Sequence, residues 1–123
     1  MASIPPRATG FTPGTILADR YRIVAPDGEG HDRTVVHHPG AVVVVPVDGD
    51  HALLVRQYRV AVRGEILELP AGKRDHGEDP AETARRELAE EAGRVAARWT
   101  DLGSNFPSPG VFCEVLYLYL AER

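Results

Sequence analysis

Several apolar runs in the sequence predict β-strands. Residues 41–47 are nearly all valine, a composition typical of a strand that is buried on both faces. A turn at 48–50 follows, and residues 52–58 form a second strong run, so the two runs predict a hairpin. A third apolar run covers 111–120. Weaker strand patterns cover residues 15–25, 33–38, 65–69 and 95–102.

The pattern changes at residues 80–92, where apolar positions recur with the period of a helix. Asp79 suits the N-cap, Pro80 suits the first helical position, and Gly93 suits the residue that follows the last turn. Glu82 stands three residues after Asp79, so the pair predicts a capping box. Strands on both sides of one long helix predict a mixed sheet with the helix packed against it.

Three carboxylates lie beside the predicted buried face of this helix. With about 100° per residue, Glu87 and Glu91 are one turn apart and Glu90 lies next to them. The apolar stripe of the helix consists of Ala81, Ala84, Leu88 and Ala92. Carboxylates this close repel one another unless a cation lies between them, and oxygen ligands favour Mg²⁺ first and Mn²⁺ next. The alternative is an ordinary solvated face, because Arg86 has i,i+4 partners in Glu82 and Glu90.

The spacing within residues 72–93 resembles the Nudix box. In that box a glycine, five residues, a glutamate and seven residues precede R-E-U-x-E-E-x-G-U, where U is apolar. The matching residues are Gly72, Glu78, Arg86, Glu87, Leu88, Glu90, Glu91 and Gly93. Arg94 stands where the last apolar residue is usual. The resemblance implies an α/β fold, the Nudix α/β/α sandwich with a mixed sheet. We expect it to lack the C-terminal helix, because the sequence ends three residues after the last predicted strand.

The residues around the box resemble the ADP-ribose pyrophosphatase branch of that family. R-Q-Y-R at 56–59, E-L-P-A-G-K at 68–73 and S-P-G at 108–110 are typical of the branch, although hydrolases of GDP-mannose and other nucleotide sugars share parts of them. The resemblance implies hydrolysis of a nucleoside diphosphate compound, with ADP-ribose giving AMP and ribose 5-phosphate. The alternatives are a hydrolase of another nucleotide sugar such as GDP-mannose, or a regulatory Nudix domain that binds such a ligand with little or no turnover.

The same resemblance assigns catalytic and metal-binding roles to individual residues. Glu87, Glu90 and Glu91 would be catalytic metal ligands for Mg²⁺ or Mn²⁺, and the Ala71 carbonyl would be a further ligand. Arg86 would orient the glutamates by ion pairing.

The resemblance also implies a substrate site beside the metal. The implied substrate-binding residues are Arg56, Arg59, Ser108 and Glu114. Arg59 would contact the diphosphate, while Ser108 and Glu114 would contact the terminal ribose. For Glu114, an outward charge on a strand is an equal alternative. The family usually takes its general base from a glutamate on a loop after the last strand, and Glu122 is a distant candidate for that role here.

Composition and charge narrow the range of partners. The 123 residues are 43% hydrophobic and 26% charged, as in an ordinary single domain, and the net charge of −4 argues against a nucleic-acid partner. Cys113 is the one cysteine, so a reducing, cytoplasmic environment is expected. On its apolar strand this residue is better explained as a small core side chain than as a nucleophile.

The two ends of the chain lead to further expectations. Residues 1–14 have no apolar core, so they predict a flexible N-terminal arm rather than a signal peptide, and no apolar run is long enough to span a membrane. Residues 15–123 would form the Nudix domain. Within it, residues 15–40 predict an N-terminal hairpin. Because one face of that hairpin needs a cover, we expect it at the interface of a homodimer.

Overall fold

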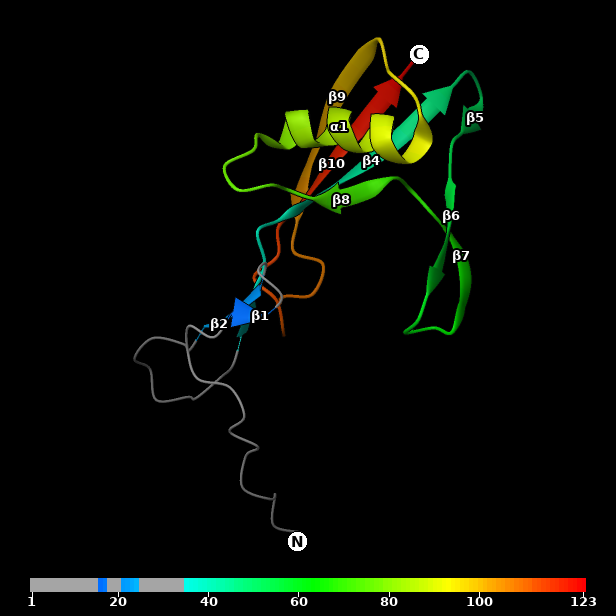
Figure 1. Ribbon diagram of the computed structural model, residues 1–123. Helices are drawn as coiled ribbons and strands as arrows, with labels where there is room; N and C mark the ends of the chain where they lie inside the picture. The colour runs from blue at the N-terminus through cyan, green and yellow to red at the C-terminus, as the bar shows by residue number, and fades with distance from the viewer. Residues whose placement is uncertain (1–15, 18–20, 25–34) are drawn as a thin grey trace, which may run out of the picture.

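The fold was obtained as a computed structural model that describes residues 16–17, 21–24 and 35–123. The arm predicted at residues 1–14 lies outside these ranges. The elements are β1 (Ile16–Leu17), β2 (Tyr21–Val24), β3 (Val35–His37), β4 (Ala41–Asp48), β5 (His51–Ala52), β6 (Val55–Arg59), β7 (Gly64–Glu68), β8 (Ala71–Lys73), α1 (Pro80–Ala92), β9 (Arg98–Asn105) and β10 (Leu116–Glu122). Figure 1 shows their arrangement.

A mixed five-stranded sheet forms the centre of the molecule. Its strands follow the order β5-β4-β10-β9, and β8 also pairs with β4. The long central strands β4 and β10 run parallel, from Ala41 opposite Leu116 to Val47 opposite Glu122. The other pairs in this sheet are antiparallel. The predicted mixed sheet is therefore confirmed, and its valine-rich strand lies between two neighbours.

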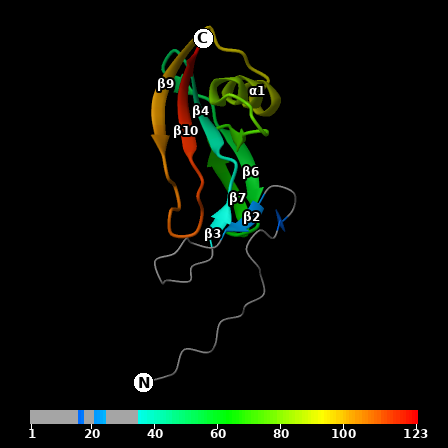
Figure 2. The same cartoon turned by 90° about the vertical axis from the view of Figure 1, so that its left-hand side faces the viewer.

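Helix α1 covers one face of this sheet, as the views in Figures 1 and 2 agree. The core between the two layers consists of Val42, Val44, Ala84, Leu88, Tyr119 and Ala121. Ala81 and Ala92 pack against this core, so the predicted apolar stripe of the helix is confirmed. The described residues supply the sheet and this one helical layer of the sandwich. Within the described ranges, no helix is long and apolar enough to cross a membrane.

The ends of α1 lie where the capping residues predict. Asp79 accepts a hydrogen bond from the Ala81 amide at 2.9 Å, and Gly93 ends the helix in the left-handed region at a φ of 61°. The predicted capping box is wrong, because the Glu82 carboxylate accepts a hydrogen bond from Arg85 at 2.6 Å instead of turning back to the N-cap.

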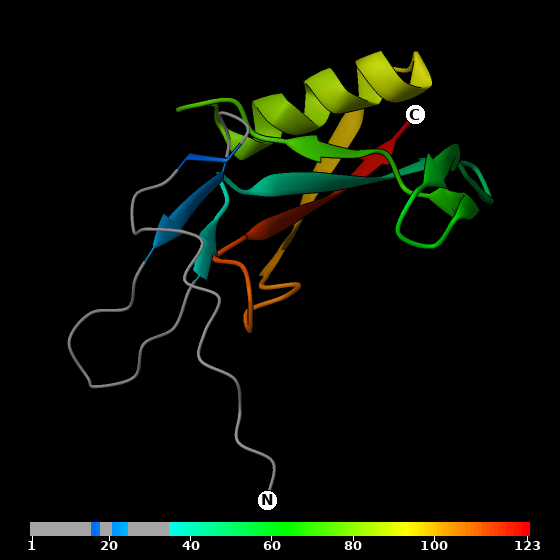
Figure 3. The same ribbon diagram turned by 60° about the horizontal axis from the view of Figure 1, so that its bottom comes forward.

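The hairpin predicted from 41–47 and 52–58 is formed only in part. Strand β5 pairs with β4, but β6 leaves the sheet and pairs with β7 in a separate two-stranded sheet (Figures 1 and 3). Pro46 explains the break. The Leu53 amide donates to the Pro46 carbonyl at 2.9 Å, but proline has no N–H to return the bond. Strand β8, which lies outside the predicted strands, takes the other half of the β4 edge.

Near the N-terminus, the predicted strand at 15–25 is described as β1 and β2, which pair with each other. Within the range of the predicted N-terminal hairpin, β3 pairs antiparallel with β2. The last two predicted strands are displaced toward the C-terminus, to Arg98–Asn105 and Leu116–Glu122.

Candidate active site

The candidate site is built where β8 passes under the middle of α1. A Cβ atom added to Gly72 would lie 2.0 Å from Cδ of Glu87 and 2.1 and 2.4 Å from its two carboxylate oxygens. Glu87 itself is only 7% exposed. The strand can therefore approach the helix this closely only because residue 72 has no side chain.

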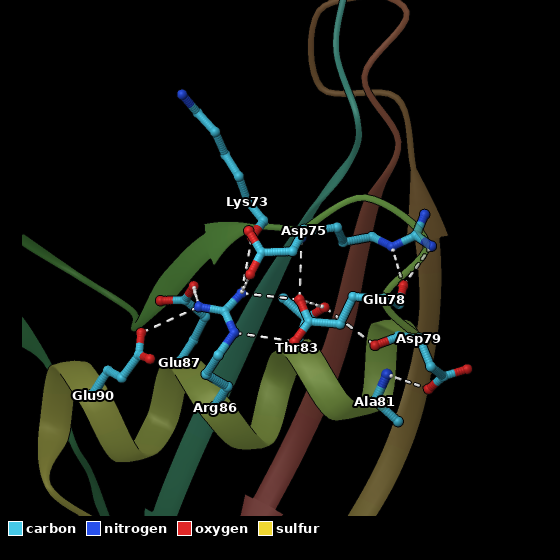
Figure 4. A network of polar contacts seen from close by, with 10 residues as sticks. Lys73, Asp75, Glu78, Asp79, Ala81, Thr83, Arg86, Glu87 and Glu90 are labelled. Atoms are coloured by element: carbon cyan, nitrogen blue, oxygen red, sulfur yellow. Dashed lines mark hydrogen bonds and ion pairs between the residues drawn. The ribbon is translucent and has the colours of Figure 1, made fainter. Parts of the chain in front are cut away.

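The Arg86 side chain holds the acidic residues of this region together (Figure 4). Its Nε and Nη2 atoms donate to the two oxygens of Glu78, both at 3.0 Å. Its Nη1 atom donates to Glu87 at 2.7 Å and to Glu90 at 3.1 Å. Nη2 also donates to the Lys73 carbonyl of β8 at 3.1 Å. These contacts are those expected of a residue that orients the glutamates by ion pairing.

Glu78 ties the loop before the helix to its first turn. Besides Arg86, its carboxylate accepts hydrogen bonds from the Thr83 hydroxyl at 2.8 Å and the Asp75 amide at 3.1 Å. These donors, Arg86 foremost, lower the pKa of Glu78 to about 2. Glu78 is therefore ionised at neutral pH, and both of its carboxylate oxygens accept hydrogen bonds within the protein. These contacts hold the loop before α1 against the first turns of the helix.

Glu91 reaches the edge of β8 at Ala71. The Val44 amide donates to the Pro70 carbonyl, and the Arg74 amide donates to the Gly40 carbonyl. Because bonding alternates along an antiparallel pair, both polar groups of the Ala71 backbone are directed away from β4. The Ala71 amide donates to the Glu91 carboxylate at 3.0 Å. The carbonyl that the sequence implies as a metal ligand therefore lies on the Glu91 side of the strand.

The donors in this region suit a hard divalent cation. Burial raises the pKa of Glu87, Arg86 opposes that effect, and the nearby charges of Glu91 and Glu90 raise the pKa further. When burial and neighbouring charge raise the pKa of a carboxyl group, a bound cation stabilises its ionised form. Carboxylates and a backbone carbonyl are ligands that Mg²⁺ accepts. Among the described residues, however, no three acidic, histidine or cysteine side chains converge as a ready-made site. Glu90 and Glu91 accept hydrogen bonds from Arg86 and from the Ala71 amide instead.

The two arginines of the R-Q-Y-R stretch lie on opposite faces of the β6–β7 hairpin, as strand alternation predicts. Arg59 forms a bidentate pair with Glu68, with Nε to Oε1 at 2.6 Å and Nη2 to Oε2 at 2.5 Å. Arg56 forms a looser pair with Glu65 at 3.7 Å. Sequence reasoning did not find the Glu68 contact, because the partners are nine residues apart on different strands.

The remaining implied substrate residues lie between β9 and β10. Ser108 is exposed, and its carbonyl accepts hydrogen bonds from the Val111 and Phe112 amides. Glu114 precedes β10 rather than lying within a strand, and its carboxylate is 3.6 Å from Nδ1 of His38. Burial lowers the pKa of His38, while Glu114 acts in the opposite direction. Within the described part of the chain, neither residue forms a hydrogen bond or ion pair with a carboxylate of α1.

Two further sequence-based interpretations need correction. Cys113 is exposed rather than buried in the core, and its sulfur lies 3.3 Å from Nδ1 of His37. Glu122 forms a bidentate pair with Arg98 at 2.7 and 2.6 Å. Since Ala121 faces α1 in the core, alternation places the Glu122 side chain on the other face of the sheet. It is therefore not placed to act as a base at α1.

A cavity of about 410 Å³ lies at the C-terminal end of α1. Its walls include Val47, Leu53, Leu88 and Ala96, and none of the implied site residues. Concavity alone would therefore point away from the acidic cluster, where the chemistry of the side chains points.

Comparison with known proteins identifies the family. A model of the NUDIX domain matches residues 36–123. The chain is 42% identical over 99 residues to an ADP-ribose pyrophosphatase of Bacillus subtilis (strain 168), which covers 80% of this chain and 54% of the relative. It is 42% identical over 98 residues to a methanol dehydrogenase activator of Bacillus methanolicus, with coverages of 79% and 53%.

Among solved structures, the crystal structure of an ADP compounds hydrolase superimposes with a TM-score of 0.65 at 29% identity, covering 83% of this chain and 57% of that chain. The chain belongs to the Nudix family, and the fold and family implied by the sequence are confirmed. It spans about half the length of the curated relatives that it matches.

Proposed function

We propose that this chain carries the metal-dependent site of an enzyme that hydrolyses the diphosphate linkage of a nucleoside diphosphate compound, with ADP-ribose giving AMP and ribose 5-phosphate. The observation that carries the proposal is the buried Glu87 carboxylate opposite Gly72, with Glu90 and Glu91 beside it and Arg86 bound to it. The names of an ADP-ribose pyrophosphatase and an ADP compounds hydrolase among its relatives support the substrate class.

Glu87, Glu91, Glu90 and the Ala71 carbonyl would hold the ion, Mg²⁺ or Mn²⁺. When bound, the ion would polarise the phosphoryl oxygens and lower the pKa of a water molecule. The surroundings of Glu87 favour binding of a cation. Burial and the neighbouring charges raise the pKa of Glu87, and the hydrogen bond from Arg86 holds its side chain against β8.

Arginine side chains of the β6–β7 hairpin would bind the substrate. Arg59 would contact the diphosphate, because a guanidinium supplies both charge and paired N–H donors for phosphate oxygens. Arg56, on the other face of the hairpin, would contact a different part of the substrate. Ser108 and Glu114 would contact the terminal ribose, where a hydroxyl and a carboxylate suit sugar hydroxyls.

A regulatory Nudix domain is the second candidate function, and the name of the activator from Bacillus methanolicus favours it. Such a domain would bind the nucleotide sugar and turn it over slowly or not at all. A third outcome is preference for another nucleotide sugar such as GDP-mannose, which the shared flanking residues allow.

The test incubates the protein with ADP-ribose, or with GDP-mannose, in Mg²⁺, Mn²⁺ or EDTA, and measures the nucleoside monophosphate released. We expect AMP from ADP-ribose only with a divalent ion. Glu91→Gln should lower turnover by at least about 10²-fold, the scale seen when one group that stabilises the transition state is removed. Glu82→Gln is the matched control on the same helix, because the Glu82 carboxylate binds Arg85 rather than a residue of the acidic cluster. Binding of ADP-ribose without AMP release would overturn the enzymatic proposal in favour of the regulatory one.

We also propose a homodimer in the cytoplasm. Apolar side chains on the β6–β7 hairpin are exposed, namely Tyr58, Val60, Val62, Ile66 and Leu67, and a projecting two-stranded sheet of this kind needs a cover. The N-terminal hairpin is the other predicted contact. Light scattering tests the assembly, and the single cysteine supports the reducing compartment.

A further inference from the structure

The Arg59–Glu68 pair connects the projecting hairpin to the candidate site. Arg59 lies near the tip of β6, and Glu68 is the last residue of β7. Nε and Nη2 of the guanidinium donate to separate carboxylate oxygens, the planar geometry in which such a pair is strongest. The Glu68 side chain is 20% exposed and that of Arg59 is 51% exposed, so the carboxylate is the better anchored partner.

The anchoring of Glu68 comes from the chain that follows it. Two residues later, Pro70 is fully buried, and its carbonyl accepts a hydrogen bond from the Val44 amide in the central sheet at 2.9 Å. The next residue is Ala71, whose amide binds Glu91. Glu68 therefore stands at the point where the hairpin joins the rigid part of the molecule, three residues from the metal-binding edge of β8.

The bidentate pair uses only one edge of the guanidinium. Arginine has five N–H donors, and two of them are committed to Glu68. Within the described part of the chain, Nη1 of Arg59 has no hydrogen-bonded partner, so the edge formed by Nη1 and Nη2 keeps a pair of donors. The pKa of Arg59 is raised, first by the hydrogen bond to Glu68 and more weakly by the charge of Glu91.

We propose that Glu68 is a positioning residue that orders Arg59 before substrate arrives and directs its unused edge toward the diphosphate. The inference rests on the proposed function, since it assigns the diphosphate to Arg59. It differs from a competing interpretation in which Glu68 blocks Arg59 and is displaced by the substrate. A blocking carboxylate would leave no bidentate edge, whereas Glu68 binds the Nε edge and leaves the Nη1–Nη2 edge with the two donors that one bidentate phosphate contact uses.

The kinetic test compares Glu68→Gln with Glu122→Gln. Both substitutions remove one bidentate pair between neighbouring strands, and the two carboxylates are 20% and 26% exposed. Glu122 faces away from α1, so its loss reports the structural cost alone. We expect Glu68→Gln to raise KM for ADP-ribose about two- to tenfold, the range for ordering one long side chain upon binding, with a smaller change in kcat. Glu122→Gln should leave KM unchanged. Equal KM values for the two variants would overturn the proposal.

A second comparison places the effect on Arg59. If Glu68 acts through the guanidinium, Glu68→Gln should raise KM no further in an Arg59→Gln background. An equal increase in both backgrounds would mean that Glu68 acts elsewhere.

The Nε–H resonance of Arg59 gives a readout that does not depend on turnover. We expect it to stay protected from exchange when ADP-ribose and Mg²⁺ are added, because the Glu68 contact is retained. Loss of protection upon binding would show displacement and overturn the proposal.

A chain that binds ADP-ribose with the resonance protected but releases no AMP contradicts only the proposed function. A chain that hydrolyses ADP-ribose with KM insensitive to Glu68→Gln contradicts only the positioning role, and a chain that neither binds nor hydrolyses it contradicts both.

Discussion

Replacing Gly72 by alanine tests the close approach of β8 to α1. The added Cβ would lie 2.0 Å from Cδ of Glu87, whereas ordinary contacts begin at 3.4 Å, so the carboxylate must move by more than about 1 Å. Overpacking of this kind costs about 1–3 kcal/mol. Alanine also restricts the unfolded chain and returns about 0.4–1 kcal/mol. With the middle of each range the steric term is the larger, and the free energy of unfolding should fall by about 1.3 kcal/mol.

Thermal unfolding measures this loss. A loss of 1 kcal/mol lowers Tm by about 4–8 °C in domains of 60–100 residues and by about 2–4 °C in domains of 150–250 residues. For this chain of 123 residues the expected fall in Tm is therefore roughly 3–10 °C. Gly110→Ala is the matched control, because nothing lies within 4 Å of a Cβ added there. The rise in Tm on addition of Mg²⁺, which we expect in the wild type, should disappear in Gly72→Ala, because the displaced Glu87 carboxylate can no longer serve as a ligand.

A double substitution isolates the contact. Glu87→Ala removes the atoms that the new Cβ would meet, so Gly72→Ala should cost almost nothing in that background. The same loss of Tm in both backgrounds would show that the carboxylate is not the cause. Wild-type stability and wild-type Mg²⁺ response in Gly72→Ala would refute the close approach itself.

Two other predictions concern acid stability and assembly. The pKa of Glu78 is lowered to about 2, so its contribution to stability is complete above its ordinary value of 4.5 and is lost as the pH falls toward 2. Urea unfolding between pH 6 and pH 2 should therefore show a weaker acid dependence in Glu78→Gln than in the wild type or in Glu82→Gln, and an unchanged dependence would contradict the Arg86 network. Light scattering at micromolar concentration should give the mass of a dimer, and Leu67→Lys on the exposed hairpin should reduce it, whereas a wild-type monomer would rule the dimer out.

The helix and the acidic cluster could be predicted because their signals are local. Asp79 and Gly93 mark the ends of α1 through their own backbone preferences, and the spacing of Ala84 and Leu88 defines its buried face. The same periodicity places Glu87 beside that face, and in the structure Glu87 is buried along with Ala84 and Leu88. Each of these properties depends on residues within about two turns of one another.

The strands at the edges could not be predicted because they depend on distant partners. Residues 71–73 have the sequence A-G-K, which has little strand preference, and form β8 only because β4 offers an unpaired edge. Pro46 did carry a local signal, since a proline ends one side of a ladder, but the surrounding valines outweighed it. The Cys113–His37 contact spans 76 residues and had no signal in the pattern.

Arg86 on α1 and Arg59 on β6 differ in how much of each guanidinium the protein itself uses. All three nitrogens of Arg86 donate to carboxylates or to the Lys73 carbonyl, so each of them is already used within the protein. Among the described residues Arg59 has one carboxylate partner, Glu68, and keeps the Nη1–Nη2 edge. A phosphate group needs N–H donors that the protein does not already use. The hydrogen-bonding pattern therefore favours Arg59 over Arg86 as the phosphate-binding arginine, independently of the family resemblance that first suggested it.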